Sequence, residues 1–338
     1  MATSRTRRRW TRAPRTDMAT ILVIAARDDW PTDRVVAVLA QRGARVFRMD
    51  ACEFPQALTL AGRIDARRGW SGGITNAHHA IDLSEVTAVY YRRPTPFQLP
   101  EGMSDPERRF AAAQARSGLG GIITALDCRW VSEPAAMSRA EYKPLQLAAA
   151  REAGLTIPPT LITNQPDAVR AFAGDIAGPL ICKPVASPVL IEDDEMKVVY
   201  TRRLTEHDLD DLRGIETTAH LFQAWVDKAY EVRLTVAGDR LLAAEVRSDT
   251  PAGHTDWRSD YRSLSYRATG TPPHIADGVR SLMRRLGLRY GALDFVVSPT
   301  GEWTFLEINP CGEWDWIQAE TGLPIADAIA DELQGVPA

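Results

Sequence analysis

Short apolar runs alternate with amphipathic segments along the first fifty residues. Thr20 to Ala26 is a continuous apolar run with several β-branched residues, which is typical of a buried parallel strand. Apolar residues then recur with helical spacing over 35–39, which predicts a helix. The pattern over 44–49 predicts a second strand. Strand, helix and strand in this order predict a βαβ unit, so we expect the chain to open with an α/β domain.

The same two kinds of pattern continue to about residue 135. The predicted elements are strands at 58–64, 73–82, 86–91 and 130–134, a turn at 67–73, and an Ala-rich helix over 105–126. No G-x-G-x-x-G motif follows the first strand. A dinucleotide site of the Rossmann type is therefore not supported.

A second unit is expected to begin near Met137. Ser138 is expected to cap a helix that carries Lys143 and ends at Gly154. The patterns that follow predict strands at 160–163, 179–183, 197–201 and 221–226, helices at 167–173 and 275–286, and hairpins over 230–247 and 291–308. Residues 248–263 are polar and are expected to form a flexible loop.

The last hairpin carries three oxygen-bearing side chains, Asp294, Glu307 and Asn309, among apolar neighbours. In a hairpin that turns near Thr300, residues whose numbers sum to about 600 face each other. Asp294 and Glu307 therefore become neighbours after a one-residue bulge, and Asn309 shares a face with Glu307. Two such carboxylates repel each other unless a cation lies between them, and hard oxygen ligands suit Mg²⁺. A sheet face with solvated acids is the alternative.

Two lysines are further candidates. Lys183 ends an apolar strand, where its side chain either snorkels to solvent or serves as a counter-charge for phosphate. Lys143, taken alone, is typical of a surface residue on a helix.

Composition narrows the class of protein. The chain has 338 residues, of which 45% are hydrophobic and 25% charged, as in ordinary globular proteins. No apolar run approaches the ~20 residues of a membrane span, so no membrane partner is expected. The four cysteines lie far apart and form no C-x-x-C pair. This argues against disulfides and zinc, and reduced thiols indicate a cytoplasmic location.

The charge is unevenly distributed. Residues 1–17 contain six arginines and one acid, a net charge of +5, whereas the whole chain carries −4 and the remainder therefore −9. An acidic body argues against nucleic acid as a partner. We expect 1–17 to be a disordered basic tail ahead of Met18; contact with nucleic acid or an acidic peptide, and organelle targeting, are the alternatives.

Taken in chain order, the candidate residues resemble the motifs of the ATP-grasp ligases. The motifs are Lys143 with Gln146, Lys183 in Ile-Cys-Lys-Pro, Gln223-Ala224-Trp225-Val226, Glu231-Val-Arg233, and Asp294, Glu307 and Asn309. The closer similarity is to the ATP-grasp ligases that mature ribosomal peptides, the graspetide or microviridin-type macrocyclases. Three segments carry it: Asp50 with Phe54-Pro55, Tyr90-Tyr91-Arg92-Arg93-Pro94, and Thr255-Asp256-Trp257-Arg258.

The resemblance implies an ATP-grasp fold of mixed α/β and α+β class, preceded by an N-terminal α/β (pre-ATP-grasp) domain. The implied domains are the basic tail over 1–17, the N-terminal α/β domain over 18–135, a central ATP-grasp lobe over 136–220, and a C-terminal lobe with the Mg²⁺ site over 221–338.

The resemblance also implies ATP and Mg²⁺ as cofactors, with a role for each candidate residue. The nucleotide would be bound by Lys143 and Lys183 at its phosphates, by the backbone of Gln223, Ala224, Trp225 and Val226 at its adenine, and by Glu231 at its ribose. The metal ligands would be Asp294, Glu307 and Asn309. Arg233 and Arg258 would stabilise charge on the γ-phosphate or on an acyl-phosphate, and are the implied catalytic residues.

The implied activity is that of an ADP-forming ligase. It would activate Asp or Glu side chains of a ribosomal precursor peptide as acyl-phosphates and join them to Thr, Ser or Lys side chains, giving ω-ester or ω-amide macrocycles. The partner would be a precursor with a leader and an acidic, Thr/Ser/Lys-containing core, and a homodimer is compatible with the related enzymes.

Two other functions remain open, and one feature departs from the family. The alternatives are a glutamate or amino-acid ligase acting on a protein or small molecule, and an ATP-binding regulatory protein without catalysis. Many ATP-grasp enzymes have a Gly-rich loop after the strand of the Lys183 type, but residues 184–197 contain no glycine. Cradling of phosphate by backbone N–H groups is therefore not expected there.

Overall fold

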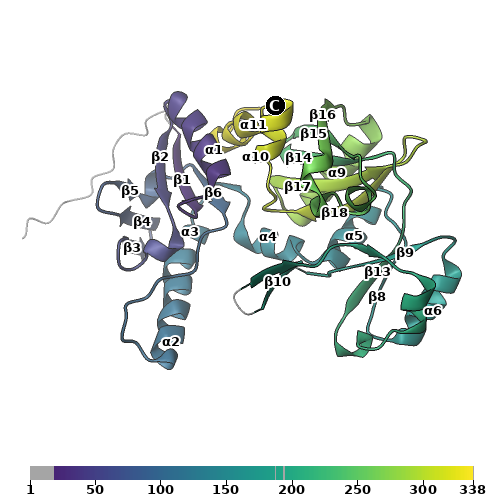
Figure 1. Ribbon diagram of the computed structural model, residues 1–338. Helices are drawn as coiled ribbons and strands as arrows, with labels where there is room; N and C mark the ends of the chain where they lie inside the picture. The colour runs from purple at the N-terminus through teal and green to yellow at the C-terminus, as the bar shows by residue number, and fades with distance from the viewer. Residues whose placement is uncertain (1–18, 187, 193–194, 338) are drawn as a thin grey trace, which may run out of the picture. The chain divides into compact units, whose positions relative to one another are not determined.

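The computed structural model describes residues 19–186, 188–192 and 195–337, so the predicted basic tail lies outside the described residues. The chain forms two compact units (Figure 1). The first contains the described residues up to Glu133 together with Ile329–Pro337, and the second is Pro134–Ala328. None of the described helices is long and apolar enough to cross a membrane.

The first unit is built on a parallel four-stranded sheet of order β2-β1-β6-β7. Its strands are β1 (Thr20–Ala25), β2 (Arg45–Met49), β6 (Ala88–Arg92) and β7 (Arg129–Val131). Helix α1 (Trp30–Gln41) joins the first two and begins where the Asp29 carboxylate accepts a hydrogen bond from the Thr32 N–H at 2.9 Å. The predicted opening βαβ unit is confirmed.

A small antiparallel sheet, β3-β4-β5, lies in the same unit. Its strands are β3 (Thr59–Asp65), β4 (Arg68–Thr75) and β5 (Ala80–Asp82). The turn predicted at 67–73 is wrong, because most of that range is strand β4. Gly72 instead lets β4 approach β3 closely. Its φ is +121°, and a Cβ at this position would lie 1.9 Å from the Ala61 carbonyl oxygen of β3.

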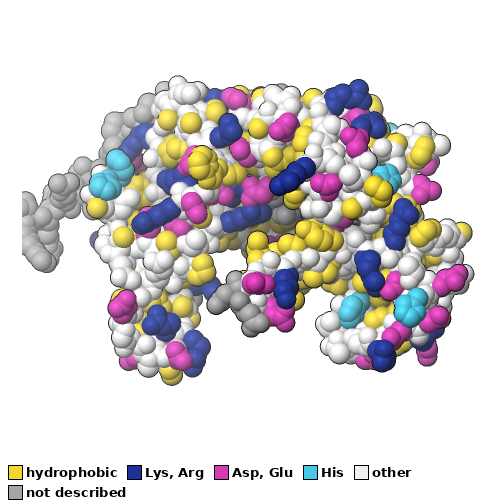
Figure 2. Space-filling view, in the orientation of Figure 1, with side chains coloured by type: hydrophobic (Ala, Val, Ile, Leu, Met, Phe, Trp, Pro, Cys, Tyr) yellow, Lys and Arg dark blue, Asp and Glu magenta, His cyan; other side chains and the backbone are white. Residues whose placement is uncertain are grey.

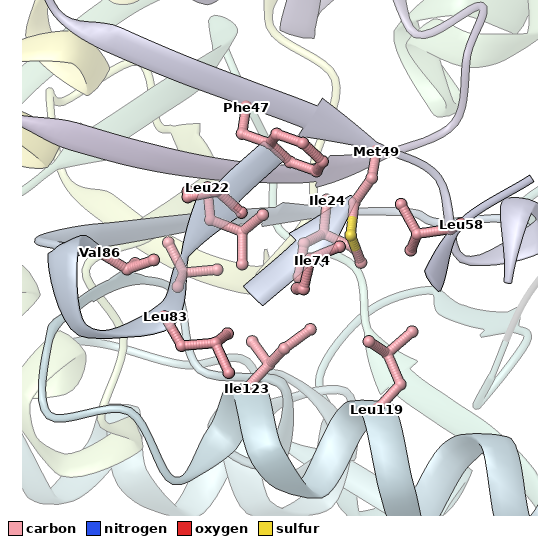
Figure 3. Packing of buried hydrophobic residues seen from close by; sticks show 12 residues of the cluster. Leu22, Ile24, Phe47, Met49, Leu58, Ile74, Leu83, Val86, Leu119 and Ile123 are labelled. Atoms are coloured by element: carbon pink, nitrogen blue, oxygen red, sulfur yellow. The ribbon is translucent and has the colours of Figure 1, made fainter. Parts of the chain in front are cut away.

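A helical run closes the core of the first unit. It consists of α2 (Asp105–Ala115), a π-helical stretch (Arg116–Gly120) and α3 (Gly121–Thr124), as the Ala-rich pattern predicts. Figure 3 shows Leu119 and Ile123 of this run packed toward Leu22, Ile24 and Phe47 of the parallel sheet. Short 3₁₀ turns at Ala51–Glu53 and Leu83–Glu85 and part of α11 (Ile325–Gln334) complete the unit.

The second unit opens with two helices, where one helix was predicted. They are α4 (Pro134–Ala140) and α5 (Lys143–Glu152), so Ser138 lies inside a helix rather than at its N-cap. Pro144 explains the error: proline has no N–H and disrupts a helix interior, but it is tolerated in a first turn. A new helix therefore starts at Lys143, which places this lysine at a helix N-terminus.

Two sheets make up the rest of this unit. The smaller has the order β12-β9-β13-β8, and its elements are β8 (Thr160–Thr163), α6 (Pro166–Asp175), β9 (Leu180–Lys183), β12 (Arg202–Arg203), α7 (Glu206–Asp210), a 3₁₀ turn (Ile215–Thr217) and β13 (His220–Ala224). Its core contains Val169, Leu212, Ile215 and Phe222.

The strand predicted at 197–201 does not return along β9. Strands β10 (Val189–Glu192) and β11 (Glu195–Val198) instead form a separate hairpin, and β9 is paired with β12 on one side and β13 on the other. Among the described residues, no third strand joins the hairpin.

The larger sheet is antiparallel, with the order β16-β15-β14-β17-β18. Its elements are β14 (Tyr230–Ala237), β15 (Arg240–Ser248), α8 (Pro251–Thr255), 3₁₀ turns (Trp257–Ser259 and Tyr261–Ser263), β16 (Leu264–Thr269), α9 (Pro273–Leu286), β17 (Tyr290–Val297), β18 (Trp303–Asn309) and α10 (Asp315–Thr321). The flexible loop predicted at 248–263 thus contains three short helical segments. Strand β18 is the edge of the sheet.

Candidate active site

The acidic pair occupies the centre of the β17–β18 hairpin. Asp294 and Glu307 are cross-strand partners, and the register shifts by one residue immediately after Asp294. This is the bulge that the residue numbering predicts, and the pairing is confirmed. Asp294 is 4% exposed, so its charge needs a nearby cation.

Arg258 supplies a cation between the two carboxylates. Its Nη2 atom donates to Asp294 Oδ2 at 2.9 Å and to Glu307 Oε1 at 3.0 Å. Burial acts against the charge of Arg258, but the two carboxylates raise its pKa further above its ordinary value. Both acidic side chains therefore converge on one cationic nitrogen.

Arg233 holds Asp294 from the neighbouring strand. It pairs with Asp294 across β14 and β17, and its Nη1 atom donates to Asp294 Oδ1 at 2.7 Å. The Nη2 atom donates to the Glu313 carbonyl at 3.0 Å. The buried Nε atom has no hydrogen-bond partner among the described residues, so a donor remains available for an anion.

Two lysines also act on Glu307, Lys143 by direct contact and Lys183 through its charge. Lys143 Nζ donates to Glu307 Oε2 at 2.5 Å. Burial lowers the pKa of Lys183 to about 8, while the Glu307 carboxylate acts in the opposite direction. Burial would raise the pKa of Glu307, but Lys143, Arg258 and Lys183 outweigh it and hold that pKa well below its ordinary value.

The predicted adenine hinge lies at the end of β13. Gln223 is fully buried, and its Nε2 atom donates to Thr160 Oγ1 at 2.8 Å. Its Oε1 atom has no partner among the described residues, which fits a ligand group that donates a hydrogen bond. The Trp225 ring lies beneath the Arg203 guanidinium, 3.6 Å from it. Ala224 and Val226 flank Trp225 and are partly buried.

Glu231, the expected ribose ligand, already forms an ion pair with Lys228. It is 8% exposed, and its Oε1 atom accepts a hydrogen bond from Lys228 Nζ at 2.5 Å. Burial raises the pKa of Glu231, against the lowering influence of Lys228. The pair leaves Oε2 as the oxygen that remains for a ligand.

The donor set fits a magnesium ion. Asp294 and Glu307 offer carboxylate oxygens, and the Arg258 nitrogen between them marks a position that a cation already occupies. Asn309 is exposed at the end of β18, and its Oδ1 atom accepts from the Cys311 N–H at 3.0 Å. Among the described residues, no group of three or more His, Cys, Asp or Glu side chains is placed to hold a metal. The donors offered here are the two carboxylates and the amide of Asn309.

The roles of three contributors were not predicted from the sequence, although Asp256 stands in a segment that carries the family resemblance. Lys228 partners Glu231, Arg203 covers Trp225, and Asp256 accepts from the Thr201 N–H at 3.1 Å and the Arg258 N–H at 3.1 Å. Lys228 and Glu231 are three residues apart, but they lie in a loop and in strand β14, so the helical spacing rule gave no signal for this pair. The contact between Arg203 and Trp225 joins separate strands and had no local signal.

Comparisons with known proteins agree with this fold. A model of the MvdD pre-ATP-grasp domain matches residues 20–138. The macrocyclase MdnC from Microcystis aeruginosa MRC, solved bound with the precursor peptide MdnA, is 31% identical, with a TM-score of 0.80, over 94% of this chain and 99% of MdnC. A search of curated proteins finds no match.

Two further solved structures are similar over nearly their full length. A RiPP-associated ATP-grasp ligase from Chryseobacterium gregarium, in complex with ADP and a leader and core peptide, is 27% identical, with a TM-score of 0.86, over 95% of this chain and 98% of that one. The macrocyclase MdnB from Microcystis aeruginosa MRC is 29% identical, with a TM-score of 0.74, over 93% and 99%.

The fold and the site together define an ATP-grasp ligase. Within that class, the chain belongs to the family of ATP-grasp macrocyclases that includes MdnC.

Proposed function

We propose that this protein is an ATP- and Mg²⁺-dependent ligase that closes macrocycles in a ribosomal precursor peptide. The observation that carries the proposal is the convergence of Arg258, Lys143 and the Asp294–Glu307 pair at one position. Relatives of this chain were solved with a precursor peptide, and with ADP and a leader and core peptide. The site and these relatives favour the same reaction.

The chemistry uses ATP to turn a poor electrophile into a good one. A carboxylate oxygen of an Asp or Glu side chain attacks the γ-phosphorus, the bond from that phosphorus to the β–γ bridging oxygen breaks, and ADP leaves. A hydroxyl or amine of the same peptide then attacks the carbonyl carbon of the acyl-phosphate, loses its proton, and expels phosphate. The sum is an ω-ester or ω-amide ring made with the loss of one water from the peptide.

The residues of the site position the reactants and neutralise charge rather than react themselves. Lys143 and Lys183 would contact the phosphates, and the strand end at 223–226 the adenine. Asp294, Glu307 and Asn309 would hold Mg²⁺, which neutralises phosphate charge when it is bound. Once its contacts are exchanged for those of the metal, Arg258 would be available with Arg233 to bind the phosphoryl oxygens.

An apolar surface on the second unit supports a peptide partner. The hairpin of β10 and β11 exposes five large apolar side chains, between 37% and 73% of their surface each: Val189, Leu190, Ile191, Met196 and Val198. Figure 2 shows hydrophobic side chains gathered over this hairpin. Exposed apolar surface on an isolated hairpin is typical of an interaction site, and an apolar stretch of the precursor is its proposed occupant.

The proposal extends to the domain limits, the location and the oligomeric state. We propose the domain limits 136–220 and 221–338 for the two ATP-grasp lobes; Ile329–Pro337, near the end of the second lobe, group with the first compact unit. All four cysteines are free, which supports a cytoplasmic location. A homodimer is retained as a prediction.

The test compares two glutamate variants of the same hairpin. Glu307→Ala removes a carboxylate that Arg258 and Lys143 both bind, and it should lower peptide-dependent ADP release at least about 100-fold. Glu302→Ala is the matched control, because Glu302 is exposed at the turn of the same hairpin, and it should retain wild-type release.

The assay uses ATP, Mg²⁺ and the peptide encoded beside this chain's gene, and measures ADP. Wild-type release from Glu307→Ala would refute the metal assignment. ADP release that depends on free glutamate or another amino acid, and not on the peptide, would favour the alternative ligase class.

A further inference from the structure

The strand that carries two of the proposed metal ligands is an edge strand. Strand β18 ends the five-stranded sheet, and among the described residues the only backbone paired with its outer side is an isolated bridge between Thr304 and Thr156. Ile308 lies between Glu307 and Asn309 and is paired with Leu293 on the inner side. Unpaired backbone groups at a buried edge are costly and leave a strand free to shift.

A single side chain completes the backbone pairing at this point. Gln146 Oε1 accepts a hydrogen bond from the Ile308 N–H at 3.0 Å, and Gln146 Nε2 donates to the Ile308 carbonyl at 2.8 Å. The amide of Gln146 therefore takes the place of a neighbouring strand. Its second N–H bonds to the Ala140 carbonyl at 2.6 Å, at the end of α4.

Helix α5 also contacts the metal-ligand segment through a second side chain, Lys143, which bonds to Glu307. Gln146 lies one turn after Lys143 on α5, and Lys143 donates to Glu307 Oε2 at 2.5 Å. Helix α5 thus holds the backbone of Ile308 and the side chain of Glu307 together. Gln146 is 3% exposed, so solvent does not replace these bonds easily.

We propose that Gln146 is a positioning residue for the metal site: it fixes the Glu307–Asn309 segment so that both side chains meet Asp294. The proposal rests on the proposed function, because it takes Glu307 and Asn309 as metal ligands. A primary amide is required, since the position needs a donor and an acceptor at once. Residues that orient metal ligands through hydrogen bonds typically contribute about 10–100-fold to metal affinity.

The experiment measures binding of Mn²⁺ in the presence of ADP, by the electron paramagnetic resonance signal of the unbound ion. Gln146→Met keeps the length of the side chain but cannot pair with Ile308, and it should weaken Mn²⁺ binding about 10–100-fold. Gln318→Met is the matched control: Gln318 Oε1 accepts from the Ala326 N–H at 2.8 Å, in the same unit but on α10. It should lower the melting temperature and leave Mn²⁺ affinity unchanged.

The outcomes distinguish failure of the positioning role of Gln146 from failure of the proposed function. Wild-type Mn²⁺ affinity in folded Gln146→Met would overturn the positioning role and leave the proposed function standing. No uptake of Mn²⁺ by the wild-type protein with ADP would overturn both. If Gln146→Met does not fold, Gln146→Asn replaces it, since it keeps the amide but is one methylene too short to reach Ile308, and the same loss is expected.

Discussion

At the scale of single residues, the site combines two carboxylates with an excess of cations. Arg233, Arg258 and Lys143 each bond to Asp294 or Glu307, and the charge of Lys183 acts on Glu307 as well. Asp256 and Glu231 also act on Arg258, and Glu231 is paired with Lys228, so five cations face four carboxylates and the local charge is slightly positive, although the chain as a whole carries −4. A locally positive site favours a polyanion such as a nucleoside triphosphate.

The protonation state of Lys183 should make the activity depend on pH. Burial lowers its pKa to about 8, so in the free protein the ammonium is present below pH 8 and is lost as the pH rises through that value. If the ammonium contacts phosphate, kcat/KM for ATP should fall between pH 7 and pH 9, by about tenfold per unit once the pH is above the pKa. A pH series of initial rates measures this.

Lys183→Arg is the control for that series. A guanidinium stays charged throughout the range, so the decline above pH 8 should disappear even if the variant is slower overall. An unchanged decline in Lys183→Arg would assign the titration to another group.

At the scale of elements, patterns that repeat within one strand or hairpin were predictable from the sequence. The pairing of Asp294 with Glu307 followed from alternation and the position of one turn, and the one-residue bulge is where the numbering requires it. The start of a new helix at Lys143 was not predicted, although Pro144 favours a helix N-terminus at this position. Residues 68–72 were misassigned because their glycines resemble a turn, whereas Gly72 lets two strands approach each other.

What could not be predicted depends on contacts between elements distant in the chain. The pairing of Gln146 with Ile308 spans 162 positions, and that of Arg258 with Asp294 spans 36. Neither leaves a periodic pattern. The resemblance to ATP-grasp ligases named Arg258 and Gln146, but only the three-dimensional arrangement shows what each one bonds.

Two glycines in helices of the second unit test the packing of these elements. A Cβ on Gly278 of α9 would lie 2.5 Å from Leu155 Cδ2 and 3.3 Å from the Ala153 carbonyl oxygen, whereas one on Gly174 of α6 meets nothing within 4 Å. Gly278→Ala should destabilise the protein by about 1 kcal/mol, because overpacking exceeds the gain in helix propensity. Gly174→Ala should stabilise it by about 0.5 kcal/mol.

Urea denaturation of the two variants measures these differences. Because both glycines lie in the same unit, one transition reports on both. Stabilisation by both substitutions would contradict the packing of α9 against Leu155.

At the scale of the whole molecule, function requires one chain to hold a nucleotide and a peptide. The second unit contains the charged site and the apolar hairpin, which suit these two ligands separately. Binding a peptide away from the reacting group raises the effective concentration of the side chains that are to be joined. That arrangement suits a ligase that makes more than one ring in a single substrate.

The most direct measurement is the mass of the precursor peptide after incubation with the protein, ATP and Mg²⁺. We expect a product lighter by one water molecule per ring, with tandem mass spectrometry placing each link between an Asp or Glu side chain and a Thr, Ser or Lys side chain. A peptide of unchanged mass alongside full ADP release would contradict it.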